Sequence, residues 1–71
     1  MSEQEKIDLI SEVLELDVDE INKEDKITKY DSWDSLAVMC FIALMDKRYG
    51  KLIRAEEMKN INSIQDIMNL M

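Results

Sequence analysis

The sequence predicts an all-α domain of four helices, with a long loop between the first two helices and a short third helix. Apolar residues recur at helical spacing in several segments, and the first and last of these begin with Ser-x-x-acid patterns typical of capping boxes. The 71 residues include one cysteine and no histidine, so neither a disulfide nor a structural zinc site supports the fold. Stability must therefore come from packed helix faces. We expect a single domain over residues 1–71.

The first helix is expected over residues 3–15. Ser2 and Glu5 form its capping box, and the apolar residues behind them share one helical face: Ile7, Ile10, Val13 and Leu14. Residues 17–34 carry many charges and few regularly spaced apolar residues, which predicts a loop of unusual length for so small a domain. The apolar residues expected to pin this loop to the core are Val18, Ile21, Ile27 and Tyr30.

The second helix is expected to run from Ser35 to about Tyr49, where Gly50, the only glycine, ends it. Residues 55–59 suffice for one short third helix. Ser63 begins the last helix in a capping pattern with Asp66, and the apolar face of that helix uses Ile64, Ile67, Met68 and Met71.

The core is expected to combine apolar residues of these helices: Ile7, Ile10, Leu14, Val38, Phe41, Ile42, Met45, Tyr49, Ile61, Ile64 and Ile67. Met45, Met58 and Met68 are interpreted as core residues rather than as a partner-binding groove. Cys40 lies mid-helix in an apolar run with no positive charge beside it. It is therefore interpreted as a small hydrophobe rather than a reactive thiol.

The charge of the chain argues against nucleic-acid binding, because the net charge is −7 and nucleic-acid affinity depends on Lys and Arg. Residues 1–34 hold twelve acids and four bases, whereas residues 35–71 hold four acids and five bases. The acidic half suits basic surfaces on partner proteins. The N-terminus is acidic, and the longest apolar run, residues 36–45, is too short for a bilayer. We expect a cytoplasmic monomer without membrane insertion.

The residue inventory predicts neither catalysis nor a metal site. Without histidine, no Ser-His or Cys-His pair can activate a nucleophile. Asp17 and Asp19 resemble the start of a calcium loop, but Ile21 and Thr28 stand where oxygen ligands are required. We therefore expect a protein that is not an enzyme.

The segment Trp33-Asp34-Ser35-Leu36 marks the entry into the second helix. Asp and Ser are common helix caps, so the segment has an ordinary structural interpretation. A serine hydroxyl at a helix N-terminus also lies beside unpaired N–H groups and the positive end of the helix dipole. A phosphodiester on Ser35 would be stabilised there, and Asp34 is suited to bind a cation that accompanies a phosphate donor.

Asp34-Ser35-Leu36, after an acidic loop and before an apolar helix, resembles the phosphopantetheine attachment motif of acyl carrier proteins. The resemblance extends over essentially the whole chain, through Tyr49-Gly50 and the segments 53–58 and 61–64. It implies a four-helix bundle of the acyl-carrier type. It also implies that a phosphopantetheinyl transferase attaches 4'-phosphopantetheine to Ser35, where Asp34 and Leu36 complete the binding motif. The arm would then carry acyl or aminoacyl groups as thioesters.

Further partners implied by the resemblance are an acyl- or aminoacyl-loading ligase and synthase or transferase enzymes. The apolar strip expected to meet them consists of Leu36, Met39 and Ala43, with Asp46 beside it. The alternative is an acidic helical module that binds a basic or amphipathic helix and carries no prosthetic group. Modification of Ser35 discriminates between the two.

The sequence also departs from fatty-acid carriers, which commonly have glycine where Ser32 stands and acids where Cys40, Lys47 and Arg48 stand. The Trp-Asp-Ser-Leu form resembles carriers of specialised pathways, and Trp33 is expected to pack the loop onto the core. Residues expected to line a cargo space are Ile42, Met45, Met58, Ile61 and Ile67. Fatty-acid members often have alanine at two of these positions, Met58 and Ile67, which predicts a short or polar cargo.

Overall fold

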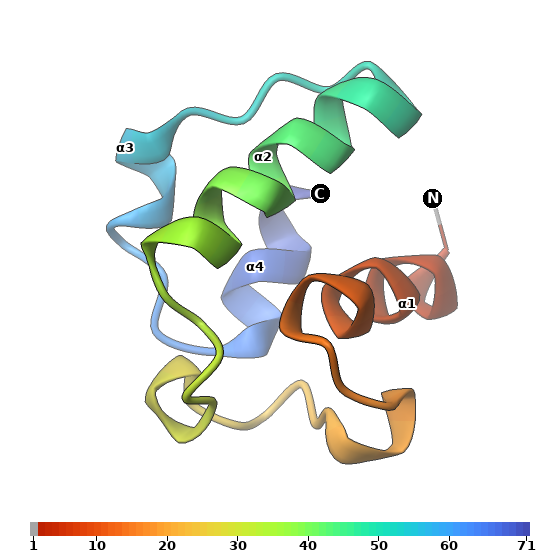
Figure 1. Cartoon of the computed structure of the whole chain (residues 1–71), viewed down its shortest axis with the longest axis vertical. Coiled ribbons are helices and arrows are strands. Elements are labelled where there is room, and N and C mark those ends of the chain that lie inside the picture. The colour runs from red at the N-terminus through yellow and green to blue at the C-terminus, as the bar shows by residue number, and fades with distance from the viewer. Residues whose placement is uncertain (1) are drawn as a thin grey trace.

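The computed structural model describes residues 2–71 and contains four α-helices in the predicted order (Figure 1). Their bounds are Glu3–Leu14 for α1, Ser35–Tyr49 for α2, Ala55–Met58 for α3 and Ile64–Leu70 for α4. Two 3-10 turns lie in the long loop, η1 at Val18–Glu20 and η2 at Ile27–Lys29. Over the described residues the only β-type pairing is one isolated bridge, Lys26 with Ser63. The predicted all-α class is confirmed.

Local hydrogen bonds set the helix ends. The Ser2 hydroxyl accepts the Glu5 N–H at 3.1 Å, and the Ser2 N–H donates to the Glu5 carboxylate at 3.3 Å. Ser63 and Asp66 form the same reciprocal box at the start of α4. Both predicted capping boxes are thus present. α2 ends at Gly50 with φ of 62°, and α1 ends one residue earlier than predicted because Glu15 has left the helix with φ of 58°.

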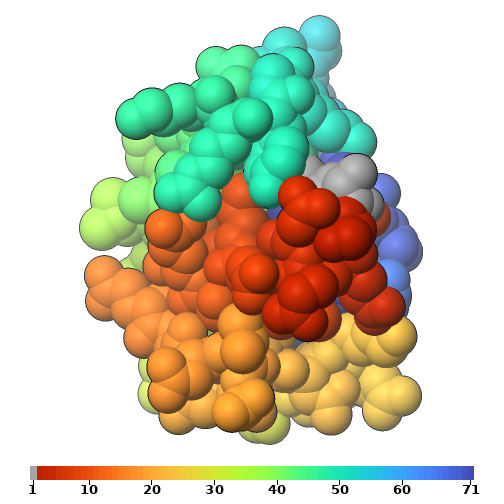
Figure 2. Space-filling view, turned by 90° about the vertical axis from the view of Figure 1, so that its right-hand side faces the viewer, coloured from red at the N-terminus to blue at the C-terminus, as the bar shows by residue number. Residues whose placement is uncertain are grey.

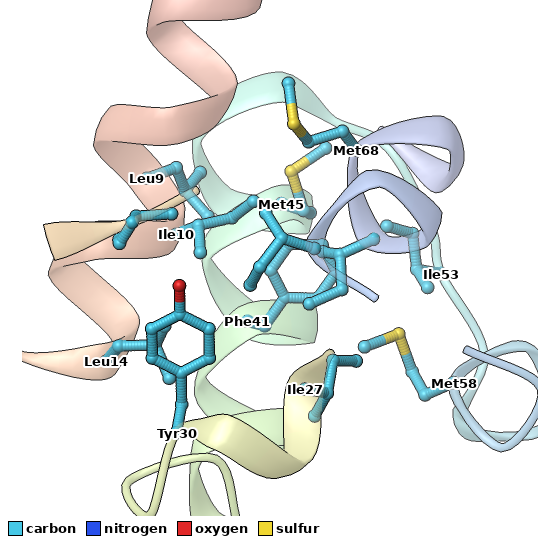
Figure 3. Packing of buried hydrophobic residues seen from close by; sticks show 13 residues of the cluster. Leu9, Ile10, Leu14, Ile27, Tyr30, Phe41, Met45, Ile53, Met58 and Met68 are labelled. Atoms are coloured by element: carbon cyan, nitrogen blue, oxygen red, sulfur yellow. The ribbon is translucent and has the colours of Figure 1, made fainter. Parts of the chain in front are cut away.

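Phe41 lies at the centre of the core, with side chains from α1, α2, α4 and the connecting segments around it (Figure 3). Six of the residues predicted for the core are buried: Ile10, Leu14, Phe41, Met45, Ile64 and Ile67. Four more are partly buried against it: Ile7, Val38, Ile42 and Ile61. The prediction for Tyr49 is wrong, because this last residue of α2 extends past the packed layer and is 41% exposed.

Several buried residues lay outside the predicted core list: Leu9, Ile21, Ile27, Tyr30, Ala37, Ile53, Met58 and Met68. Met58 and Met68 confirm the interpretation of the methionines as core residues. Ile53 is buried because the chain turns back after Gly50 and lays the segment before α3 against the bundle (Figure 1).

The long loop is fastened to the start of α4 by its backbone. The Ile27 N–H donates to the Asn62 carbonyl at 2.9 Å, and the Ile64 N–H donates to the Asp25 carbonyl at 3.1 Å. Ile21, Ile27 and Tyr30 are buried as predicted. The prediction for Val18 is wrong: η1 turns this side chain outward, and it is 37% exposed.

Tyr30 adds a polar connection within the loop. Its hydroxyl donates to the Asp25 carboxylate at 2.8 Å and accepts the Asn22 N–H at 3.2 Å. Burial raises the pKa of Tyr30, and hydrogen bonds from Lys29 and Tyr30 lower the pKa of Asp25. Hydrogen bonds of both the backbone and the side chains therefore fix the conformation of the loop that leads to α2.

None of the helices formed by residues 2–71 combines the length and apolar character needed to cross a bilayer.

Candidate functional site

Asp34 begins α2 and fixes its first turn. The backbone of Asp34 is extended, and its carboxylate accepts the Ala37 N–H at 2.9 Å. The Asp34 carbonyl accepts the Val38 N–H at 3.0 Å, which is the first helical hydrogen bond. These two contacts make Ser35 the first residue of the helix, so its side chain lies at the N-terminal end of α2.

The hydroxyl-bearing residue Ser35 is exposed, as are Asp34 and Leu36 on either side of it. The N–H groups of Ser35 and Leu36 have no hydrogen-bond partner among residues 2–71. They lie at the positive end of a 15-residue helix, where negative charge is stabilised. The site therefore fits a phosphate ester on the Ser35 oxygen, because the oxygen is accessible and the surrounding dipoles favour an anion.

Trp33 holds the loop against α2 immediately before the site. Its ring meets Phe41 edge to face with ring centroids 6.3 Å apart, and the backbone N–H of Trp33 donates to the Tyr30 carbonyl at 3.1 Å. The indole is half-buried against the core. Trp33 thus packs the loop onto the core, as expected, and this contact positions the end of the loop that leads into Asp34.

Two hollows flank the first turns of α2. A groove of about 340 Å³ lies toward α3 and is lined by Ser35, Val38, Met39, Ala55, Met58 and Lys59. A smaller hollow of about 200 Å³ lies toward the end of α1 and is lined by Val13, Leu14, Glu15, Ser32, Asp34, Leu36, Ala37 and Cys40. We call these the α3-side groove and the α1-side hollow.

The residues predicted to meet partners are all exposed. Leu36 and Met39 have exposed fractions of 69% and 68%, and Ala43 and Asp46 are also exposed. Leu36 borders the α1-side hollow, whereas Met39 borders the α3-side groove. The predicted strip is thus a ridge between two depressions.

Cys40 was interpreted as a small hydrophobe rather than a reactive thiol, and the structure shows that its side chain is not packed into the core. Its thiol is free and exposed, because Cys40 lies on the outer side of α2 and borders the α1-side hollow. The buried positions of this part of the helix are Ala37, Phe41 and Met45 instead.

The predicted cargo space is largely filled. Met45, Met58 and Ile67 are buried, and Ile42 and Ile61 are partly buried. Of these five residues only Met58 borders the α3-side groove, whose other apolar walls are Val38, Met39 and Ala55. The space beside Ser35 is therefore an open surface groove rather than an interior channel.

Charge is arranged unevenly along α2. Residues 35–45 contain no charged side chain, and the last turn contains Asp46, Lys47 and Arg48. The Arg48 guanidinium binds the Glu12 carboxylate of α1 through both terminal nitrogens. This hydrogen-bonded pair lowers the pKa of Glu12 and raises the pKa of Arg48. Lys47 makes no ion pair among the described residues.

The α1-side hollow and the contribution of Glu15 to it were not anticipated from the sequence. The only local signal is that Glu15 stands where the helical pattern of α1 stops. Within residues 2–71 no group of three or more His, Cys, Asp or Glu side chains is arranged to hold a metal ion.

A protein-family model described as "phosphopantetheine attachment site" matches residues 7–71 of the chain. The match covers α2, α3 and α4 in full and α1 from Ile7 onward, and it includes the entry into α2. A search of curated proteins gives no significant match.

Proposed function

The chain belongs to the phosphopantetheine attachment-site family, and on that basis we propose that it carries acyl or aminoacyl groups as thioesters on an arm attached to Ser35. Membership of the family gives the general role of a carrier with covalent 4'-phosphopantetheine. The assignment of Ser35 is supported by its exposed hydroxyl at the first position of α2. We propose that residues 1–71 form one carrier domain.

The chain provides an acceptor, and the chemistry of attachment belongs to a phosphopantetheinyl transferase. The Ser35 oxygen forms a new ester bond to the phosphorus next to pantetheine in coenzyme A. The pyrophosphate bond of coenzyme A breaks, adenosine 3',5'-bisphosphate leaves with the electron pair of that bond, and the hydroxyl proton passes to a base of the transferase. The chain itself supplies no histidine for this step. When attached, the arm supplies a terminal thiol that forms thioesters.

Asp34 has two roles in this proposal. One carboxylate oxygen accepts the Ala37 N–H and holds the first turn of α2. The second oxygen has no partner among residues 2–71 and remains available for the magnesium ion that accompanies coenzyme A. Leu36 is 69% exposed beside the acceptor and offers the transferase an apolar contact.

We also propose that the carrier serves a specialised pathway and a short or polar cargo. Three of the residues that would have to make room for a long acyl chain, Met45, Met58 and Ile67, are buried in the core. Packed interiors resist added methylene groups. Ser35 opens onto the α3-side groove, where a short group on the arm can lie without displacing the core. Loading ligases and synthases would meet the ridge of Leu36, Met39 and Ala43.

The test is modification by a broad-specificity phosphopantetheinyl transferase with coenzyme A and magnesium, followed by mass spectrometry of the intact protein. Wild type is expected to gain one phosphopantetheine, Ser35→Ala none, and the control Ser2→Ala one. Asp34→Asn retains an oxygen for the Ala37 N–H but loses the charge, and we expect slower modification at low magnesium. If wild type is not modified by several transferases, the chain is a binding module rather than a carrier.

A further inference from the structure

Consecutive residues of α2 face different depressions around the acceptor serine. Ser35 borders the α3-side groove, whereas Asp34 and Leu36 border the α1-side hollow. One turn later, Met39 borders the α3-side groove and Cys40 borders the α1-side hollow. A partner can therefore seat a side chain on one side of α2 while the group on Ser35 lies on the other.

The α1-side hollow has apolar walls and a negative edge. Val13, Leu14 and Ala37 form the apolar part, and the carboxylates of Glu15 and Asp34 lie at its border, with no basic residue among those that line it. Its volume of about 200 Å³ is smaller than that of small-molecule sites, which usually measure about 300 to 1,000 Å³. This size suits one or two side chains of a protein partner.

The carboxylates at this edge are not paired with a basic side chain of the described residues. On α1, the Glu12 carboxylate is bound by Arg48, but neither Glu15 nor Asp34 makes an ion pair among residues 2–71. Figure 2 shows α1 beside the first part of the long loop, with the start of α2 at their edge. Residues 15–34 contain eight acids and three bases, so the surroundings add to the negative potential.

We propose that the α1-side hollow is the docking site of the phosphopantetheinyl transferase, which inserts an apolar side chain flanked by Lys or Arg. The proposal rests on the proposed function, because only an acceptor chain needs this enzyme. The enzyme must reach the Ser35 oxygen, and the hollow is bordered by the residues immediately before and after it. An apolar anchor in a pocket gives affinity, and the basic flank meets Glu15, whose carboxylate makes no ion pair among residues 2–71.

Cys40 provides a direct test, because it is the only cysteine and its exposed thiol borders the hollow. Apo protein labelled at Cys40 with a bulky neutral maleimide is expected to lose at least tenfold in kcat/KM with a broad-specificity transferase. The control is Leu52→Cys combined with Cys40→Ala, labelled in the same way. Leu52 is 69% exposed in the segment after α2, away from both depressions, and its label is expected to change kcat/KM less than twofold.

A third labelled protein identifies the side that is used. Met39→Cys with Cys40→Ala puts the same label at the α3-side groove. If that label blocks modification and the label at Cys40 does not, the docking site lies on the opposite side of α2 and the proposal is wrong. Circular dichroism of each labelled protein confirms that the helices are retained.

The charge is tested by comparing two reversals with the same effect on net charge. Glu15→Lys is expected to raise KM about tenfold and to weaken the dependence of kcat/KM on salt, because the rim charge is lost. Glu24→Lys, in the loop away from the hollow, is expected to change KM less than twofold. Equal effects of the two variants would show that only net charge matters and would overturn the proposed contact.

The outcomes separate this inference from the proposed function. If the wild-type chain gains no phosphopantetheine, both the carrier function and the docking site are contradicted. If the wild-type chain is modified at Ser35 and the Cys40-labelled chain is modified equally fast, only the docking site is contradicted.

Discussion

Arg48, in the last turn of α2, binds Glu12 of α1 with two guanidinium nitrogens, and Nη2 lies 3.0 Å from Oε1. The pair joins residues 36 positions apart in the sequence and connects the end of the motif helix to the first helix. In Figure 2 the end of α2 lies against α1. Arg48 therefore connects α2 to α1, in addition to placing positive charge at the end of α2.

Arg48→Met is expected to lower the melting temperature more than Lys47→Met does. Both variants remove a cation that complements the helix dipole, but only Arg48 holds a carboxylate. The pair is exposed, so the difference is small and should fade in about 1 M salt. Thermal unfolding followed by circular dichroism measures it. Equal losses in the two variants would show that the pair contributes nothing.

The same pair predicts a pH dependence. Arg48 lowers the pKa of Glu12 in the folded state below its ordinary value of 4.5. The stabilisation is therefore fully present above about pH 4.5 and is lost as the pH falls through the lowered pKa. The difference in melting temperature between wild type and Arg48→Met should shrink on acidification below pH 4.5.

Glu15→Gly is expected to stabilise the protein by about 0.5 to 1 kcal/mol, because the left-handed backbone favours glycine. Glu15 has φ of 58° and is the only non-glycine residue with positive φ among residues 2–71. Gly50 supplies the matched control, with φ of 62°. No atom lies within 4 Å of a Cβ built there, so Gly50→Ala should cost about 1 kcal/mol from the backbone alone. Urea unfolding measures both; the same sign for both variants would contradict the prediction.

Tyr30→Phe is expected to destabilise the protein by about 1 kcal/mol. The change removes the hydrogen bond to Asp25 and leaves the Asn22 N–H without its partner. The effect should be local to the loop before α2. Hydrogen exchange of loop amides should accelerate in the variant while the amides of α1 stay protected. Uniform acceleration over the chain would indicate global destabilisation instead.

The helices were predictable from the sequence because their start and stop signals are local. Ser2, Ser63 and Gly50 act within three or four residues, and each performs the predicted role. The entry into α2 was predictable for the same reason, since Asp34 caps the helix through its own first turn.

Features that depend on packing between distant segments were not predictable in this way. Leu9 and Ile53 are buried because of where α1 and the segment after α2 lie in the bundle, which periodicity alone does not specify. Cys40 lies within the apolar run of α2 and Tyr49 in its last turn, but both are exposed, because the buried residues of α2 lie along one side of the helix. The α1-side hollow combines residues 13–15 with residues 32–40 and exists only once these segments meet.

An octanoyl group on the arm is expected to leave the melting temperature of the wild type nearly unchanged. The interior is filled by Met58 and Ile67, so an eight-carbon chain has only the surface groove to lie in. Met58→Ala is expected to cost about 2 kcal/mol or more and to leave a space. In that variant the octanoyl group should raise the melting temperature. A marked rise in the wild type would show that the chain enters the core.

We expect general fatty-acid enzymes to use this carrier poorly. The resemblance implies acids at positions where this chain has Cys40, Lys47 and Arg48, and the first eleven residues of α2 carry no charge. A basic enzyme surface that complements those acids would form no ion pairs with the first eleven residues of α2, and it would repel Lys47. Ion pairing with Glu12 already offsets the charge of Arg48.

Because Arg48 is paired with Glu12 and Lys47 makes no ion pair among the described residues, the test changes Lys47 and keeps Arg48. Cys40→Glu with Lys47→Glu restores two acids on exposed positions and keeps Arg48, whose removal would release Glu12. Both proteins are loaded with malonate and compared as substrates of a fatty-acid ketosynthase. We expect the double variant to have a kcat/KM about tenfold higher, mostly through KM, with a steeper loss in salt. A Glu24→Gln, Lys47→Gln variant has the wild-type net charge and should gain less. If wild type is already a good substrate and the double variant is no better, the charge of α2 does not determine which enzymes use this carrier.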